Sequence, residues 1–262
     1  MEPPNGVDAP GVLWHGVAEA RGSFGSSSHS ESSSMFTLDR LVPWGRSFDE
    51  YQRMCALTKN DLGLKIVGCG DGPANFNAEA TRRGSTVVSC DPIYRYDVDQ
   101  LRERIAATSE EILDQTRRNA TEFVWTAIRS VEELGQVRMA AMDDFLDDYP
   151  AGRTDGRYVD AELPSLPFDD LSFDLALSSH FLFLYTTQLG DSFHRHAIRE
   201  MCRVAREVRI FPLLALGTVP SPLVESVAAE FGREGFDVSI EEVPYEFQRD
   251  GNKMMRIRRA VA

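Results

Sequence analysis

Three glycines at alternate positions, Gly68, Gly70 and Gly72, directly follow the mostly apolar run 64–67. Glycine lets a backbone turn tightly and lets a ligand touch the main chain. After a helix-length segment and a second apolar run, 86–90, the acid Asp91 stands at the predicted end of the next strand. A carboxylate at that place can accept both hydroxyls of a ribose. Together these residues predict a site for a cofactor that contains adenosine.

The spacing of the glycines narrows the choice of cofactor. A dinucleotide-binding bend has the pattern GxGxxG, but the position of its last glycine is occupied here by Pro73. The pattern is GxGxG instead, and Asp91 follows Gly68 by 23 positions. We therefore disfavour a nicotinamide-dependent dehydrogenase. Ordinary strand–helix turns also contain such glycines, and Asp91 could be a solvated strand-end acid or a helix cap.

A third stretch, 166–179, has the sequence LPFDDLSFDLALSS. With the glycine bend and Asp91, it resembles the class I S-adenosylmethionine-dependent methyltransferases over about residues 62–259. The stretch is similar to the strand-four signature of the ubiquinone-biosynthesis-like subgroup, and the wider chain resembles a bacterial branch of it. The resemblance implies S-adenosylmethionine as cofactor and methyl transfer to an acceptor that the residues do not identify. One departure is Ile66, which stands where the family usually has an acid.

The resemblance also implies which residues form the site. Expected to bind the cofactor are Arg46, Gly68, Cys69, Gly70, Gly72, Asp91, Ile93, Asp160, Ala161 and Ser178. Within this set Asp91 is the ribose candidate, Asp160 resembles the position at the adenine edge, and Arg46 could pair with the carboxylate of the cofactor. His180 follows the predicted fourth strand and is the candidate general base. A packing or hydrogen-bonding histidine is the alternative.

The composition and charge of the chain argue against several classes of partner. The 262-residue chain carries a net charge of -13, which disfavours nonspecific binding of nucleic acid. No apolar run has the roughly 18 residues of a membrane span, so the expected partner is a small molecule. None of the four cysteines forms a CxxC pair, and His194 and His196 point to different faces of a helix. We therefore predict no metal site and a reducing, cytoplasmic location.

The order of patterns predicts the fold class and the domains. Residues 1–34 are rich in Pro, Gly and Ser and are expected to form a disordered tail. Residues 35–262 form one domain, in which strands and helices alternate and 97–150 is a helical insertion. Alternation predicts a doubly wound, mostly parallel α/β sheet of seven strands. Asp250-Gly251 near the end predicts an antiparallel hairpin at one edge.

Two other functions stay open at this stage. The chain could be a methyltransferase-like protein that binds the cofactor or serves as a scaffold without turnover, and Ile66 gives this interpretation some weight. It could also be a transferase that uses S-adenosylmethionine for another reaction. The oligomeric state is not determined by the sequence.

Overall fold

The structure is a computed structural model, and it describes residues 42–259. The tail predicted for residues 1–34 and the predicted start of the domain at residue 35 lie outside the described residues. Within residues 42–259, no helix combines the length and the apolar character that crossing a membrane requires.

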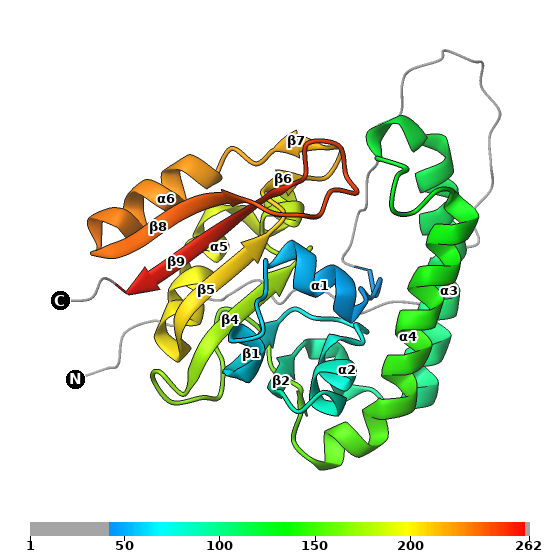
Figure 1. The fold of residues 1–262 in the computed structure, drawn as a ribbon, viewed down its shortest axis with the longest axis horizontal. Coiled ribbons are helices and arrows are strands. Elements are labelled where there is room, and N and C mark those ends of the chain that lie inside the picture. Colours follow the sequence, from blue (N-terminus) through cyan, green and yellow to red (C-terminus); the bar gives the residue numbers. More distant parts are fainter. Residues whose placement is uncertain (1–41, 260–262) are drawn as a thin grey trace, which may run out of the picture.

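A seven-stranded sheet with the order β3-β2-β1-β4-β5-β9-β8 forms the centre of the molecule (Figure 1). β9 runs antiparallel to its neighbours β5 and β8, and the other strand pairs are parallel. The predicted fold class is therefore confirmed, including the antiparallel hairpin at the edge. The strands are β1 (Lys65–Cys69), β2 (Thr86–Cys90), β3 (Tyr158–Val159), β4 (Phe173–Ser179), β5 (Ala205–Phe211), β8 (Phe236–Glu242) and β9 (Lys253–Arg259); β6 (Leu214–Ala215) and β7 (Val219–Pro220) form a separate ribbon.

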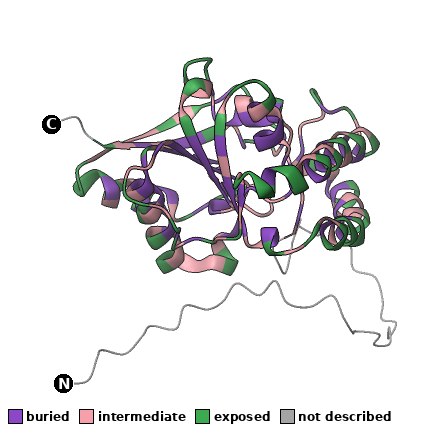
Figure 2. Ribbon diagram, turned by 90° about the horizontal axis from the view of Figure 1, so that it is seen from below, coloured by how far each residue is buried: buried purple, intermediate pink, exposed green. Residues whose placement is uncertain are grey.

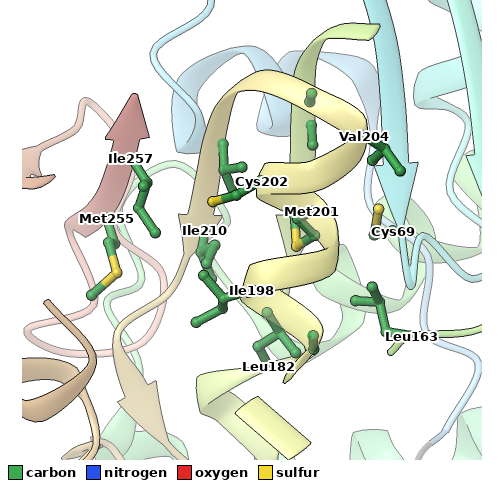
Figure 3. Close-up of a cluster of buried hydrophobic side chains, with 14 of the residues drawn as sticks. Cys69, Leu163, Leu182, Ile198, Met201, Cys202, Val204, Ile210, Met255 and Ile257 are labelled. Carbon is green, nitrogen blue, oxygen red and sulfur yellow. The ribbon is translucent and has the colours of Figure 1, made fainter. Parts of the chain in front are cut away.

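Helices cover both faces of the sheet, so its central strands are buried on both sides (Figure 2). The helices are α1 (Phe48–Met54), α2 (Phe76–Arg82), α3 (Val98–Arg118), α4 (Val131–Thr154), α5 (Thr186–Val204) and α6 (Val224–Arg233). Neighbouring residues in the middle of β1 and β4 belong to different apolar clusters, as the period of a strand requires: Val67, Cys69 and Ala176 lie in one, and Ile66, Leu175 and Leu177 in the other. One cluster contains α5 and α6 and the other contains α1 and α2. Figure 3 shows the first cluster, in which Ile198, Met201 and Cys202 of α5 lie among side chains of β5 and β9.

The segment 97–150, with a few residues beyond it, forms the long helices α3 and α4, which lie side by side (Figure 1). Asp97 and Gln100 begin α3 with a reciprocal capping box, and the Ser130 hydroxyl caps α4 by accepting from the backbone of Glu133. Their apolar stripes pack with Tyr158 of β3 and with the turn after β2 in a third cluster. This packing places the two helices beside the β2–β3 side of the sheet.

Candidate functional site

A cleft lies at the carboxyl ends of β1, β2 and β4. Its volume is about 1330 Å³, including the part that is open to solvent. The bend after β1, the ends of β2 and β4, and the residues before α1 form one part of the wall. Helices α3 and α4 and the loop between β8 and β9 form another part. Open α/β sheets bind their ligands at this edge, so the predicted site residues are expected to gather here.

The glycine bend between β1 and α2 lines the cleft. Gly70 and Gly72 have φ angles of 73° and 58°, in the left-handed region that favours glycine. A Cβ on Gly70 would lie 2.7 Å from the ring of Phe181, so the missing side chain lets Phe181 pack against the bend. A Cβ on Gly72 would meet no atom within 4 Å. The space beside the Gly72 Cα is therefore open, whereas its N–H donates to Asp91 and its carbonyl accepts from the Tyr94 hydroxyl.

Asp71, inside the bend, folds its side chain back over Gly68. A Cβ on Gly68 would lie 1.8 Å from Asp71 Oδ2, so Gly68 provides the space for this carboxyl group. The Tyr51 hydroxyl donates to Oδ1 at 2.9 Å, and the Ser89 hydroxyl donates to Oδ2 at 2.6 Å. Burial raises the pKa of Asp71 to about 6, although these hydrogen bonds oppose the rise. Ile66 is buried in the core, so Asp71 supplies a carboxyl group to the cleft where Ile66 cannot.

Asp91 follows β2, and its carboxylate accepts two backbone hydrogen bonds. The N–H of Gly72 donates to Oδ2 at 2.8 Å, and the N–H of Ile93 donates to Oδ1 at 2.9 Å. The first bond ties the carboxylate to the glycine bend, and the second caps the short helical turn after β2. Burial raises the pKa of Asp91 to about 7; the backbone hydrogen bonds lower it, while Asp71 and Glu162 raise it further. Asp91 thus caps a turn and lines the cleft at the same time.

Arg46 reaches the cleft from the segment before α1. Its Nη1 donates to the carbonyl of Trp44. Its Nε is buried, and no atom of residues 42–259 accepts a hydrogen bond from it. Burial and the positive charge of Arg138 lower the pKa of Arg46 to about 10, so the guanidinium remains charged at neutral pH. A buried donor on a cation in a cleft wall is suited to bind a carboxylate.

A second buried cation, Arg138 of α4, is absent from the residues that the sequence predicts. Its side chain is 1% exposed, and its Nη1 donates to Oε2 of Glu50 in α1. Ser47 donates to the same oxygen from its backbone N–H and its hydroxyl, and the Tyr245 hydroxyl donates to Oε1 at 2.8 Å. Burial would raise the pKa of Glu50, but the charge and hydrogen bond of Arg138 outweigh it and lower the pKa to about 2. The pair is therefore ionised.

The sequence does contain one signal that could have identified Arg138. Along α4, Leu134, Arg138, Met142 and Phe145 recur every three or four residues, and the other three belong to the apolar core. Such a stripe is expected to be apolar, and a charged side chain is rarely buried without a partner. The pattern alone does not reveal the partner, because Glu50 lies 88 residues earlier in the chain.

His180 follows β4 in the left-handed region, with a φ of 53°. Its backbone N–H donates to the carbonyl of Phe211 at 2.7 Å, and its Nδ1 lies 2.9 Å from the hydroxyl of Ser179. Burial, followed by the charges of Arg46 and Arg138, lowers the pKa of His180 well below 6.5. The imidazole is therefore neutral at neutral pH, the form in which one ring nitrogen can accept a proton.

The cleft gathers most of the residues predicted for the site. Those that line it are Arg46, Cys69, Gly70, Gly72, Asp91, Ala161 and His180. They come from the segment before α1 and from the ends of β1, β2, β3 and β4. The topology therefore brings together residues that are far apart in the sequence.

Four predicted residues lie outside the lining, each for a visible reason. Gly68 is covered by the carboxyl group of Asp71. Ile93 is buried in the apolar cluster with α3 and α4. Asp160 is exposed and pairs with Arg95 at 3.2 Å, while Ser178 is fully buried within β4. In the described part of the chain, no group of His, Cys, Asp or Glu side chains is arranged to hold a metal ion.

Comparison with other sequences finds a close relative without a described activity. No protein-family model matches the chain. The chain is 32% identical over 224 residues to the uncharacterized protein MJ0045 from Methanocaldococcus jannaschii, and the match covers 85% of this chain and 98% of the relative. This relative is archaeal, whereas the sequence motifs resemble a bacterial branch. The branch and the ubiquinone-biosynthesis-like subgroup therefore stay predictions.

Comparison with solved structures finds methyltransferases of low sequence identity. Magnesium protoporphyrin IX methyltransferase from Synechocystis PCC 6803 with bound S-adenosylmethionine is 11% identical, with a TM-score of 0.41 over 77% of this chain and 73% of that chain. A 1,6-didemethyltoxoflavin-N1-methyltransferase from Burkholderia thailandensis is also 11% identical, with a TM-score of 0.39 over 76% and 72%. A putative RNA methyltransferase from Pyrococcus horikoshii is 10% identical, with a TM-score of 0.39 over 77% and 79%. At these TM-scores the matches carry no argument about what this chain binds.

Proposed function

We propose that this chain, which belongs to the same family as the uncharacterized protein MJ0045 from Methanocaldococcus jannaschii, is an S-adenosylmethionine-dependent methyltransferase of a small molecule. The observation that carries the proposal is the link between Asp91 and the glycine bend. Asp91 Oδ2 accepts from the N–H of Gly72 at 2.8 Å, and both residues line one cleft. A carboxylate and exposed main chain at the ends of adjacent parallel strands are the groups that a nucleoside requires.

Four groups in the cleft fit different parts of the cofactor. The Asp91 carboxylate would accept hydrogen bonds from the ribose hydroxyls, and the main chain from Gly70 to Gly72 would contact the methionine part. The buried and unpartnered Nε of Arg46 suits the carboxylate of the cofactor. Asp71 would bind its ammonium group, the role that the usual acid loses at Ile66.

The remaining predicted residues contribute in different ways. Cys69 and Ala161 line the cleft and would contact the cofactor directly. Gly68 makes room for Asp71, and the N–H of Ile93 orients Asp91. Asp160 and Ser178, which lie outside the cleft lining, have no part in the proposal.

S-adenosylmethionine, when bound, supplies a methyl group on a positively charged sulfur, which is already activated for transfer. The residues of this chain then have to position the acceptor and exclude water, and positioning alone can supply much of the rate. His180 is neutral at neutral pH because burial and two neighbouring cations lower its pKa. The neutral ring can accept a hydrogen bond from an attacking hydroxyl or amine, while the same burial and cations make it a weak base.

The acceptor would enter between the helical insertion and the loop that joins β8 and β9. This side of the cleft is lined by apolar groups such as Leu134 of α4, Leu216 and Phe247. Apolar walls with a few placed polar groups are typical of sites for small molecules. The net charge of -13 also favours a small molecule over nucleic acid as the acceptor. We also propose a cytoplasmic location for the protein.

Calorimetry with S-adenosylmethionine and S-adenosylhomocysteine tests the cofactor. We expect both to bind the wild-type chain, and Asp91→Ala to lower both affinities by at least about a hundredfold because it removes two charge-assisted hydrogen bonds. Asp160→Ala is the matched control, since this acid is exposed and paired with Arg95 on the surface. Unchanged affinity in Asp91→Ala would remove the proposed ribose site.

Turnover distinguishes the proposal from the two alternatives. A screen of small metabolites with isotopically labelled S-adenosylmethionine should yield a product that carries the labelled methyl group. Transfer of a different group would indicate another S-adenosylmethionine-dependent transferase. Binding of the cofactor without any product would indicate a binding or scaffold protein.

A further inference from the structure

Arg138 is more deeply buried than its hydrogen bonds explain. Its side chain is 1% exposed; Nη1 donates to the carboxylate of Glu50, and the Tyr245 hydroxyl also interacts with the guanidinium group. Nε and Nη2 are buried, and neither has a hydrogen-bond partner anywhere in residues 42–259. Burying charged donors without acceptors is costly. Arg138 also lines the cleft, so a ligand in the cleft can supply the missing acceptors.

The charges around Arg138 do not cancel. Arg46 lies close enough to Arg138 for the positive charge of Arg138 to lower the pKa of Arg46. Glu50 is the acid that pairs with Arg138. The oxygens of Glu50 already accept from Ser47 and Tyr245 as well as from Arg138. Glu50 is therefore the acid that pairs directly with Arg138, and its oxygens are fully engaged. The acids that line the cleft are Asp71, Asp91 and Glu162. Water could satisfy the free N–H groups, but an anionic ligand would supply acceptors and a charge opposite to that of the guanidinium group.

The geometry of the two unpartnered nitrogens indicates the kind of anion. Nε and Nη2 form one edge of the planar guanidinium, and this edge matches two oxygens of a carboxylate or a phosphate. The cleft that Arg138 lines also has apolar and aromatic side chains in its wall. Phe123 and Phe247 have ring centroids 5.0 Å apart, and Leu134 lies one turn before Arg138 on α4. The cleft therefore combines one anion-binding edge with apolar side chains in its wall.

Arg138 belongs to a different part of the cleft from Asp91. Asp91 is held by the glycine bend and the turn after β2, whereas Arg138 projects from the helical insertion toward α1 and Tyr245. The cofactor proposed above already has Arg46 available for its carboxylate. With Arg46 assigned to the cofactor carboxylate, the neighbouring Arg138 can serve the other ligand of the reaction.

We propose that the acceptor molecule has an apolar body and a carboxylate or phosphate group, and that the Nε–Nη2 edge of Arg138 binds this anionic group. The inference rests on the proposed methyltransferase function, because it assumes that the cofactor occupies the side of the cleft near Asp91. Glu50 positions Arg138 and offsets part of its charge.

Anion binding to the protein saturated with S-adenosylhomocysteine tests the inference. Inorganic phosphate and benzoate are the two probes, and calorimetry is the readout. We expect at least one of them to bind the wild-type chain, and the one that binds identifies the preferred group. Arg138→Gln should weaken this binding by at least about tenfold. Glu50→Gln should strengthen it several-fold, because it removes the opposing charge beside Arg138.

Arg138→Gln and Glu50→Gln are expected to change anion affinity in opposite directions, and this difference distinguishes a role in binding from a role in folding. Arg138→Gln leaves Glu50 buried without its ion pair and could unfold the chain. The double variant Glu50→Gln/Arg138→Gln removes both charges, so it should fold, bind S-adenosylhomocysteine normally and still fail to bind the anion. A merely structural role for Arg138 would not make Glu50→Gln a tighter anion binder.

Three results would overturn the inference. The first is that neither probe binds the saturated wild-type protein. The second is that the double variant binds the anion as tightly as wild type. The third is that the double variant loses affinity for S-adenosylhomocysteine but not for 5′-methylthioadenosine, which lacks the amino-acid part; Arg138 would then bind the cofactor carboxylate. Failure of wild type to bind S-adenosylhomocysteine at all would instead remove the proposed function.

Discussion

Replacing Asp91 by asparagine should make the protein more stable and, at the same time, unable to hold the cofactor. The carboxylate of Asp91 is buried, and this burial raises its pKa from 3.8 to about 7. The cleft thus keeps a group that is unfavourable in its charged form. Such a group is expected where a ligand supplies the missing interactions.

The size of the expected gain in stability follows from the pKa shift of Asp91. A rise from 3.8 to about 7 corresponds to a cost of about 4 kcal/mol for the ionised carboxylate in the folded state. Asparagine avoids this cost, but its amide can accept only one of the two bonds from Gly72 and Ile93. Losing the other bond costs about 1 to 2 kcal/mol. At about pH 8, Asp91→Asn should therefore gain roughly 2 to 3 kcal/mol in the free energy of unfolding.

The gain should depend on pH in a defined direction. Protonation of Asp91 contributes stability that is fully present below about pH 4 and is lost as the pH rises through about 7. The advantage of the asparagine variant is therefore constant above about pH 7 and shrinks toward pH 4. Urea unfolding of both proteins at about pH 8 and about pH 5.5 measures it, and Asp160→Asn serves as the control at an exposed acid.

Two results would refute this reasoning. One is an Asp91→Asn variant that is less stable than wild type at about pH 8. The other is an advantage that does not shrink on acidification. Calorimetry on the same samples should show that the variant loses at least about a hundredfold in affinity for S-adenosylhomocysteine, because two charge-assisted hydrogen bonds are lost.

Further predictions concern the same cleft. Gly68→Ala should destabilise the protein by about 1 to 3 kcal/mol, because the new Cβ would lie 1.8 Å from Asp71 Oδ2. Gly232→Ala is the control, since its new Cβ would have no atom within 4 Å, and thermal melts compare the two variants. In calorimetry, Arg46→Ala should lower the affinity for S-adenosylhomocysteine by about tenfold or more and leave the affinity for 5′-methylthioadenosine unchanged. Equal losses of affinity for both ligands would contradict a contact between Arg46 and the cofactor carboxylate. Affinity of wild type for S-adenosylhomocysteine should fall by up to about tenfold per pH unit below about pH 7, as Asp91 takes up a proton; a flat profile between pH 6 and 8 would argue against an ionised ribose acceptor.

Much of the fold could be predicted because its signals are local. Ser47 and Glu50 have the spacing of a capping box, which predicts the start of a helix, and the structure contains this reciprocal capping box at the start of α1. The apolar run that becomes β4 predicts a strand buried on both faces, which the structure confirms. Boundaries were less accurate, because they depend on partners elsewhere in the chain. The pattern of residues predicts a helix over 189–204; α5 spans Thr186–Val204 but has a non-helical break at Gly190, next to the predicted start. β3 is limited to Tyr158–Val159 by its short pairing with β2.

For the site, the sequence by itself determined the groups that a strand and its following turn can present. The glycine spacing and the acid at the end of β2 are of this kind, because both are read from neighbouring residues. The tertiary structure decided which of these groups reach a common cleft. It placed Asp91 there and left Asp160 at the surface with Arg95, although both follow strands of the same sheet.

Only the tertiary structure could join Glu50 with Arg138 and with Tyr245, which lie 88 and 195 residues away in the chain. Helical periodicity places Arg138 on the buried stripe of α4, but it does not say what that stripe faces. The partner depends on how α1, α4 and the β8–β9 loop pack together. That packing is set by apolar contacts throughout the domain, so no local pattern of residues encodes it.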